Sequence, residues 1–429
     1  MDARGIPIRL LVLTILLLAA CAPTPPPAAE DPTDQCEAPE AVPPHLRCAY
    51  TDVDAAVEGW AVAVARAEDE GPTTPRPTPE PQVPTAFGVT LDVADANRGS
   101  QLLEADHRQL VAIMLDRLDP SLTTVTVDIG FPLLLPRWVP DAAAYLDFYR
   151  WLADAASQRD LRLGIRMPML WDRSELSRFR LGLTADGRAD LNAVAAGYLA
   201  MAQAIVTGLK PHSLTLVPDP LLFEGRWTGD EVPTPASASP ALRLLAGTAR
   251  GLAPGSTKVG AGMSMRADAE HRRAWSSTLC TNTSLQYVDT TITGTSPQEV
   301  PALRQTAEEA EQCGRSLAMS APWLVKATSG SEIGPVALAE ARGRDTLSCF
   351  EALDIRFHEL LVTAARDVGA EWLTPGHSDL YFAYLDCESY AQEPVRSLVL
   401  DDLPQEAADA AINAEVSALG AAYPAMLDR

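Results

Sequence analysis

The chain has 429 residues, a formal net charge of −23 at pH 7 and 47% hydrophobic residues. This acidic balance argues against a nucleic-acid-binding protein, because recognition of phosphates needs clustered lysines and arginines, and no basic cluster suggests electrostatic binding to a membrane. The length suits one large domain of about 250–300 residues with additional segments.

Residues 1–20 have the pattern of an export signal. Two arginines precede an apolar run that ends at Ala20 and is too short to span a membrane as a stable helix. The stretch from Leu18 to Cys21 resembles the lipobox of bacterial lipoproteins, which implies cleavage before Cys21 and a diacylglycerol on its sulfur. Ala22 follows, which in a Gram-negative cell does not favour retention at the inner membrane. We therefore expect a cell-envelope protein anchored to the membrane by this lipid; an ordinary signal peptide with a chance cysteine is the alternative.

The next segment, residues 21–85, is predicted to be a tether. Residues 22–85 hold 14 of the 35 prolines, a composition typical of an extended, poorly packed chain. A short helix is predicted over residues 50–70, because apolar residues recur there on one helical face. We expect this helix to dock on the main domain, and a free, solvated helix is the alternative. The apolar face comprises Val53, Val57, Trp60, Ala61 and Val64.

Six cysteines remain once the lipidated Cys21 is set aside. An even number in an oxidising compartment favours disulfides, and no two cysteines have the CxxC spacing of a metal or redox pair. We expect the second pair to staple one βα unit at the bottom of the domain and the third to hold an insertion near its top. The expected pairs are Cys36–Cys48, Cys280–Cys313 and Cys349–Cys387.

From Ala86 onward one pattern repeats: a short β-branched strand, a turn and a helix. Eight such units over about 300 residues predict an α/β fold, a (β/α)8 TIM barrel over residues 86–429, because strands that alternate with helices pair in parallel. An open doubly wound sheet is the alternative, although no glycine-rich dinucleotide fingerprint follows the first strand. The predicted strands are 86–94, 123–131, 161–169, 212–220, 257–265, 285–293, 315–323 and 370–378.

The alternation along these strands predicts which side chains face the barrel interior. Bulky apolar residues at every second position, such as Val125 and Val127, should face the helices, so the opposite set should face inward. Inward residues near the carboxyl ends of the strands should line the mouth, where active sites of this fold lie. The charged residues placed there are Asp92, Asp128, Arg166, Asp219 and Arg266.

Tryptophans lie at or beyond several strand ends, at positions 138, 171, 227 and 323. Aromatic faces suit stacking on sugar rings, and carboxylates and arginines would hydrogen-bond to hydroxyls. Two alternatives stay open: each tryptophan could pack in the core, and the charged residues could form a salt-bridged layer that holds the mouth together. The further candidate ligand-binding residues are Trp171, Glu224, Trp227, Asp289, Trp323, His377 and Asp379.

The predicted barrel resembles retaining glycoside hydrolases of the large (β/α)8 clan that includes cellulases, β-galactosidases and arabinogalactanases, over residues 86 to about 400. Members end the fourth strand in Asn-Glu-Pro, and the matching Pro-Asp-Pro here has Asp219 at its centre, which implies an acid/base role for this residue. They end the seventh strand in a nucleophilic Glu, often as Glu-x-Gly-Trp, and the matching stretch here is Ser320 to Trp323. Trp372, near the eighth strand, also fits the clan. Ser320 cannot replace a carboxylate that must form and release a glycosyl ester.

Two functions of different class follow. In the first, the mouth binds a carbohydrate or another small polar ligand, with hydrolysis degenerate or absent, which Ser320 favours. In the second, the protein is an active glycoside hydrolase with Asp219 as general acid and a non-standard second carboxylate. The two carboxyls would lie about 5–5.5 Å apart in a retaining enzyme and about 6.5–9.5 Å apart in an inverting one. No metal or organic cofactor is expected. The candidates for the second carboxylate are Asp128, Glu224, Asp289 and Asp379.

Overall fold

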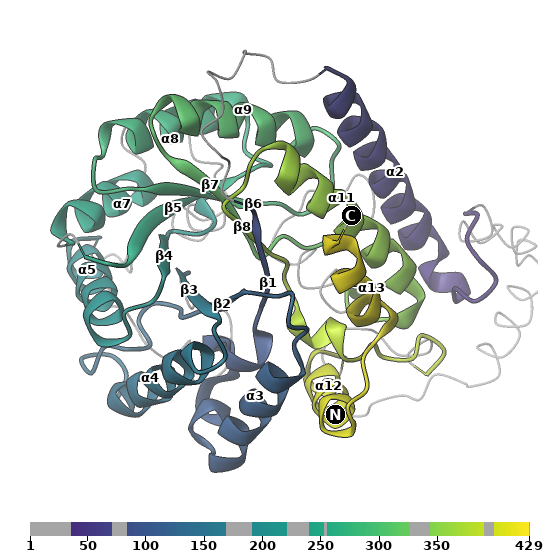
Figure 1. Cartoon of the computed structure of the whole chain (residues 1–429), viewed down its shortest axis with the longest axis horizontal. Helices are drawn as coiled ribbons and strands as arrows, with labels where there is room; N and C mark the ends of the chain where they lie inside the picture. Colours follow the sequence, from purple (N-terminus) through teal and green to yellow (C-terminus); the bar gives the residue numbers. More distant parts are fainter. Residues whose placement is uncertain are drawn as a thin grey trace, which may run out of the picture.

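Eight parallel strands close into one barrel in chain order, from β1 to β8, with helices around it (Figure 1). The strand β1 pairs with both β2 and β8, so the sheet has no free edge. This confirms the predicted (β/α)8 barrel, and the doubly wound alternative was wrong. The computed structural model describes residues 36–70, 84–168, 191–220, 240–252, 255–326, 344–389 and 399–428.

Each strand lies inside the segment predicted for it and is shorter than that segment. None of the helices in the described ranges is long and apolar enough to cross a membrane. The strands are β1 Ala86–Thr90, β2 Thr124–Asp128, β3 Arg162–Met167, β4 Ser213–Leu216, β5 Lys258–Ser264, β6 Tyr287–Thr291, β7 Ser316–Ser320 and β8 Trp372–Thr374. The α-helices are α2 Arg47–Glu70, α3 Ala105–Arg117, α4 Ala142–Ser157, α5 Leu191–Gly208, α7 Pro240–Gly251, α8 Ala269–Thr281, α9 Glu299–Gln312, α11 Glu351–Asp367, α12 Val399–Asn413 and α13 Ala418–Leu427. The 3-10 helices used below are η4 Asp92–Ala94, η5 Ala96–Leu103, η7 Ser348–Phe350 and η8 Ser378–Tyr381.

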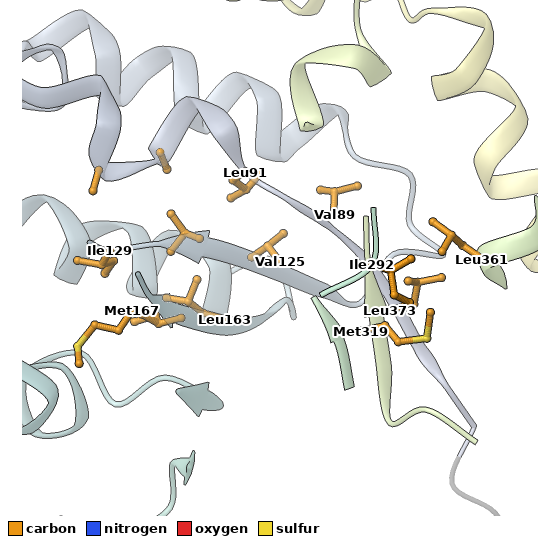
Figure 2. Packing of buried hydrophobic residues seen from close by; sticks show 14 of the residues in the cluster. Val89, Leu91, Val125, Ile129, Leu163, Met167, Ile292, Met319, Leu361 and Leu373 are labelled. Atoms are coloured by element: carbon orange, nitrogen blue, oxygen red, sulfur yellow. The ribbon is translucent and has the colours of Figure 1, made fainter. Parts of the chain in front are cut away.

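The main hydrophobic core lies between the strands and the helices. Val89, Val125 and Leu163 belong to it, and Figure 2 shows them packed with other buried apolar side chains. Val125 and Val127 are both fully buried, as predicted for residues that face the helices. Burial of each such side chain contributes about 1.5–3 kcal/mol. The period-two pattern therefore assigned the outer face of the barrel correctly.

The inside of the barrel is filled by side chains and hydrogen bonds. The rings of Tyr287 and Trp372 meet edge to face, with centroids 4.8 Å apart. Gly260 leaves room for them, because a Cβ there would lie 2.4 Å from the Tyr287 ring. Above the rings, the hydroxyls of Thr126 and Thr374 are 3.0 Å apart and both are buried. The barrel is thus a packed core, and its mouth has a solid floor.

The helix predicted at 50–70 is α2, which begins at Arg47. It packs against α11 and α9 on the outside of the barrel (Figure 1). Trp60 is fully buried and meets Phe357 of α11 edge to face, with ring centroids 5.3 Å apart. Glu58 forms an ion pair with Arg356 at the edge of this contact. The predicted docking is confirmed, and the freely solvated helix was wrong.

All three predicted disulfides are present. Their Cα–Cα distances of 5.0, 5.2 and 5.7 Å lie in the usual range for disulfides. Cys280 lies near the end of α8 and Cys313 directly follows α9, so this bridge lies at the amino ends of the strands, as expected. Cys349 lies in η7, at the opposite end, and Cys387 follows η8.

Candidate ligand site at the barrel mouth

The carboxyl ends of the strands carry most of the predicted site residues. They include Asp92 after β1, Asp128 at the end of β2, Arg166 near the end of β3, Asp219 after β4, Arg266 after β5, Trp323 after β7, and His377 and Asp379 after β8, whereas Asp289 lies in the middle of β6. The predictions that fall outside the described residues are the signal peptide with Cys21, and Trp171, Glu224 and Trp227.

The segments that follow β8 and β1 meet through two pairs of ionisable side chains. Arg98 of η5 donates to Asp379 over 2.7 Å, and both side chains are largely buried. The Nδ1 atom of His377 lies 3.3 Å from a carboxylate oxygen of Asp92. Burial raises the pKa of Asp379, and the Arg98 guanidinium opposes this rise. Four ionisable side chains from two loops are therefore brought together.

A third pair lies on neighbouring strands. The Nε atom of Arg166 is 3.5 Å from an oxygen of Asp128, and only 6% of the Arg166 surface is exposed. Burial raises the pKa of Asp289 beneath them, while the charge of Arg166 acts in the opposite direction. The Arg166 guanidinium thus interacts electrostatically with two carboxyl groups, those of Asp128 and Asp289.

Asp95 is a mouth residue that the sequence reasoning missed. Its side chain caps η5 by accepting a 2.6 Å hydrogen bond from the backbone N–H of Asn97. Burial raises the pKa of Asp95 to about 7, helped by the charges of Asp128 and Asp92 and opposed by the Asn97 hydrogen bond and by Arg98. This carboxyl therefore titrates near neutral pH. The signal available in the sequence was the polar run Asp-Ala-Asn-Arg directly beyond the first strand.

On the other side of the mouth, Asp219 faces Arg266. Their nearest atoms are 3.9 Å apart, and the side chains are 7% and 16% exposed. Burial raises the pKa of the nearby Glu299 carboxyl, and the charge of Arg266 opposes part of this rise. Glu299 accepts hydrogen bonds from the backbone N–H groups of Thr293 and Gly294. Its carboxylate therefore stabilises the loop between β6 and α9.

Ser320, which the sequence resemblance placed at the nucleophile position, is 2% exposed and ends β7. Its hydroxyl accepts a hydrogen bond from Trp372 Nε1 over 3.0 Å, and its backbone N–H donates to Asp289 over 2.8 Å. Thr215 donates to the second oxygen of Asp289 over 2.7 Å. Ser320 and Asp289 therefore belong to the hydrogen-bonded interior beneath the mouth.

Two of the four tryptophans lie in the described part of the chain. Trp323 is partly buried, and its ring is edge to face with that of His377, with centroids 6.2 Å apart. Trp138 packs edge to face on Phe131, and a Cβ at Gly197 would lie 2.3 Å from its ring. Trp323 thus lies beside the charged groups of the mouth, whereas Trp138 is committed to packing.

This arrangement can hydrogen-bond a polar ligand from several directions. Acidic and basic groups form pairs around the mouth, and an indole lies next to His377. Within the described ranges, no group of three or more His, Cys, Asp or Glu side chains has a geometry suited to a metal ion.

No family model and no curated protein matches this chain. Solved structures of similar fold include an intracellular xylanase of Thermoanaerobacterium saccharolyticum in complex with xylotriose, with 10% identity and a TM-score of 0.39, over 70% of this chain and 88% of that one. A broad-specificity endoglucanase from an uncultured bacterium has 13% identity and a TM-score of 0.40, over 76% and 94%. The β-glucosidase of Trichoderma harzianum has 11% identity and a TM-score of 0.46, over 77% and 99%.

Proposed function

We propose that this protein binds a carbohydrate at the mouth of its barrel and does not hydrolyse it. The observation that carries the proposal is the set of partly buried acid–base pairs at the strand ends, with Trp323 beside one of them. Hydroxyl groups of a sugar can donate to carboxylates and accept from guanidinium groups, while its ring covers an indole.

Binding without hydrolysis is favoured by the environment of the acids. A glycosidase needs one carboxyl that gives up a proton and a second that acts as nucleophile or base. Asp219 lies 3.9 Å from the Arg266 guanidinium and is thus paired with a cation across the mouth. Ser320, at the position of the clan's nucleophile, is hydrogen-bonded to Trp372 inside the barrel.

One observation favours hydrolysis as a second candidate function. Burial and neighbouring carboxylates raise the pKa of Asp95 to about 7, which suits a general acid at neutral pH. In that case the two carboxyls would be Asp95 and Asp219, on opposite sides of the mouth.

The test is calorimetric titration of the mature domain with xylotetraose, cellotetraose, mannotetraose and chitotetraose, combined with an assay for new reducing ends. We expect at least one of these sugars to bind without being cleaved. Trp323→Ala and Asp219→Asn should each weaken binding about ten-fold, whereas Trp151→Ala, a change on the outer helix α4, should not. Cleavage that disappears in Asp95→Asn or Asp219→Asn would establish the hydrolase instead. Absence of binding to all four sugars would contradict both.

We also propose that the protein is lipid-anchored in the cell envelope. The support is the lipobox-like stretch that ends at Cys21, followed by a proline-rich segment. Mass spectrometry of the N-terminal peptide should find a diacylglycerol on Cys21, and Cys21→Ala should move the protein from the membrane fraction to the soluble one. A mature N-terminus elsewhere, with unmodified Cys21, would show an ordinary signal peptide.

A further inference from the structure

Asp219 lies on a turn with an unusual backbone conformation. Val217, directly after β4, has a φ of +46°, in the left-handed region that β-branched residues rarely enter. Of the six non-glycine residues with positive φ in the described ranges, three lie at the ends of strands in the mouth: Val217, Ala321 and His377. Such conformations persist only where the surrounding structure holds them, and they gather at functional sites.

Tyr198 holds the turn from the helix side. Its hydroxyl accepts a hydrogen bond from the Val217 N–H over 2.9 Å and donates one to the Met167 carbonyl over 2.6 Å. The hydroxyl thus ties the turn after β4 to the end of β3. Tyr198 is fully buried in α5, so no water competes for these bonds.

Thr291 holds the same turn from the sheet side. Its hydroxyl donates to the carbonyl of Pro218, the residue before Asp219, over 2.8 Å in a buried setting. Gly262 of β5 permits this close approach, because a Cβ there would lie 2.1 Å from the same carbonyl oxygen. Contacts from α5, β5 and β6 therefore converge on the two residues that precede Asp219, and Tyr198 links them to the end of β3.

This convergence exceeds what the end of a strand requires. The backbone N–H of Val217 could have found a partner in an ordinary turn, without the cost of a left-handed β-branched residue. The geometry that results places the Asp219 carboxylate, 7% exposed, opposite Arg266.

We propose that Tyr198 and Thr291 are positioning residues. They hold the turn formed by Val217 and Pro218 so that Asp219 meets the ligand at the mouth. The inference rests on the proposed function, since it assigns to both hydroxyls a role in the binding that Asp219 provides.

The experiment compares Tyr198→Phe and Thr291→Val with two matched controls. Tyr423→Phe removes a buried tyrosine hydroxyl that donates to the Gly88 carbonyl, far from this turn. Thr290 is the neighbour of Thr291 in β6, and its buried hydroxyl donates to the Ala318 carbonyl. Thr290→Val removes this hydroxyl. Each variant is titrated with the tetrasaccharides named above, unfolded in urea, and studied by hydrogen exchange over residues 213–220.

We expect Tyr198→Phe and Thr291→Val to bind the best of the four sugars about ten-fold more weakly than their controls, with faster exchange confined to residues 213–220. A double variant of Thr291→Val with Asp219→Asn should bind no worse than Asp219→Asn alone, because the hydroxyl acts through that carboxylate. The global free energy of unfolding should be matched between each variant and its control, so that a general loss of stability is not mistaken for positioning.

The possible failures are distinguishable. If Asp219→Asn weakens binding while Tyr198→Phe and Thr291→Val behave like their controls, the positioning role is wrong and the proposed function stands. If the wild-type protein binds no sugar, or Asp219→Asn binds like wild type, the proposed function fails at Asp219 and this inference fails with it.

Discussion

The carboxyl of Asp95 changes its charge near neutral pH, which gives the stability of this protein a pH dependence of definite sign. Its pKa is raised from the ordinary 3.8 to about 7, first by burial and then by the charge of Asp128. The folded protein therefore keeps a proton that the unfolded chain releases. As the pH rises from about 4 to about 7, this group lowers the free energy of unfolding.

We predict that Asp95→Asn raises the stability at pH 8 by on the order of 1–2 kcal/mol and changes it little near pH 4. The amide keeps an oxygen that can cap η5 and removes the charge. Urea unfolding at the two pH values measures the effect. Asp268→Asn is the control of opposite sign: hydrogen bonds from the His271 backbone lower the pKa of this cap residue, so its charge stabilises the fold above that pKa. A stabilised Asp268→Asn or a destabilised Asp95→Asn at pH 8 would contradict the assignment.

Lys326 is a second residue whose charge bears on stability, in the segment that follows β7. Its side chain is 1% exposed and donates to Asp354 over 2.5 Å, with Asp345 at 3.8 Å. Tyr384 donates to the second oxygen of Asp354 over 3.0 Å. These contacts join the segment after β7 to the start of α11 and to the segment after η8.

We predict that Lys326→Met lowers the free energy of unfolding by about 3–5 kcal/mol at pH 7, because two buried carboxylates lose their cation. The loss should shrink as the pH falls and the carboxyls become neutral. Arg66→Met is the control: this arginine forms an exposed pair with Glu70 and should matter by less than about 0.5 kcal/mol. Equal effects of the two changes in urea unfolding would show that Lys326 does not stabilise the fold.

At the scale of elements, α2 behaves as part of the barrel domain. Its apolar face lies on α9 and α11, and Val53, Val57, Trp60 and Val64 are all buried. A proline-rich segment joins this helix to the barrel in sequence. The position of the helix is therefore set by its packing against α9 and α11. The helix thus extends the outer layer of helices beyond the eight-fold repeat.

We predict that Trp60→Ala costs about 3–5 kcal/mol of stability, because a large cavity opens against Phe357. Val62→Ala on the exposed face of the same helix, where Val62 is 67% exposed, should change stability by less than about 0.5 kcal/mol. A single cooperative urea transition that shifts for Trp60→Ala would show that α2 unfolds with the barrel. Loss of a separate, earlier transition would instead mean that α2 is an independent unit.

At the scale of the whole molecule, the repeat pattern was sufficient to predict the architecture. The eight strands alternating with helices, and the inward orientation of residues such as Thr126 and Asp128, follow from periodicities within short stretches of sequence. The contacts between mouth residues far apart in the chain cannot be predicted from such periodicities. Arg98 meets Asp379 across 281 positions of the chain, and no local pattern in the sequence connects two residues so far apart. Tyr198 reaches Val217 from the buried side of a helix, where it reads as an ordinary core residue.

The disulfides cross-link segments of this fold. We expect the stabilisation from each disulfide to increase with the length of the loop that it closes. Cys349 and Cys387 are separated by 38 residues, and Cys36 and Cys48 by 12. A cross-link restricts the unfolded chain more when the loop is longer. The longer bridge also joins two segments at the top of the barrel, where Ser348 N–H donates to the Leu385 carbonyl over 2.8 Å.

We therefore predict that replacing Cys349 and Cys387 together by alanine costs about 4 kcal/mol, and replacing Cys36 and Cys48 together about 3 kcal/mol. Urea unfolding under non-reducing conditions measures both. The shorter loop closes around the start of α2, so its loss should also loosen the contact of Tyr50 with Phe350, whose ring centroids are 5.7 Å apart. A larger loss from the shorter bridge would mean that its stabilisation comes from the docking of α2 and not from the entropy of the unfolded chain.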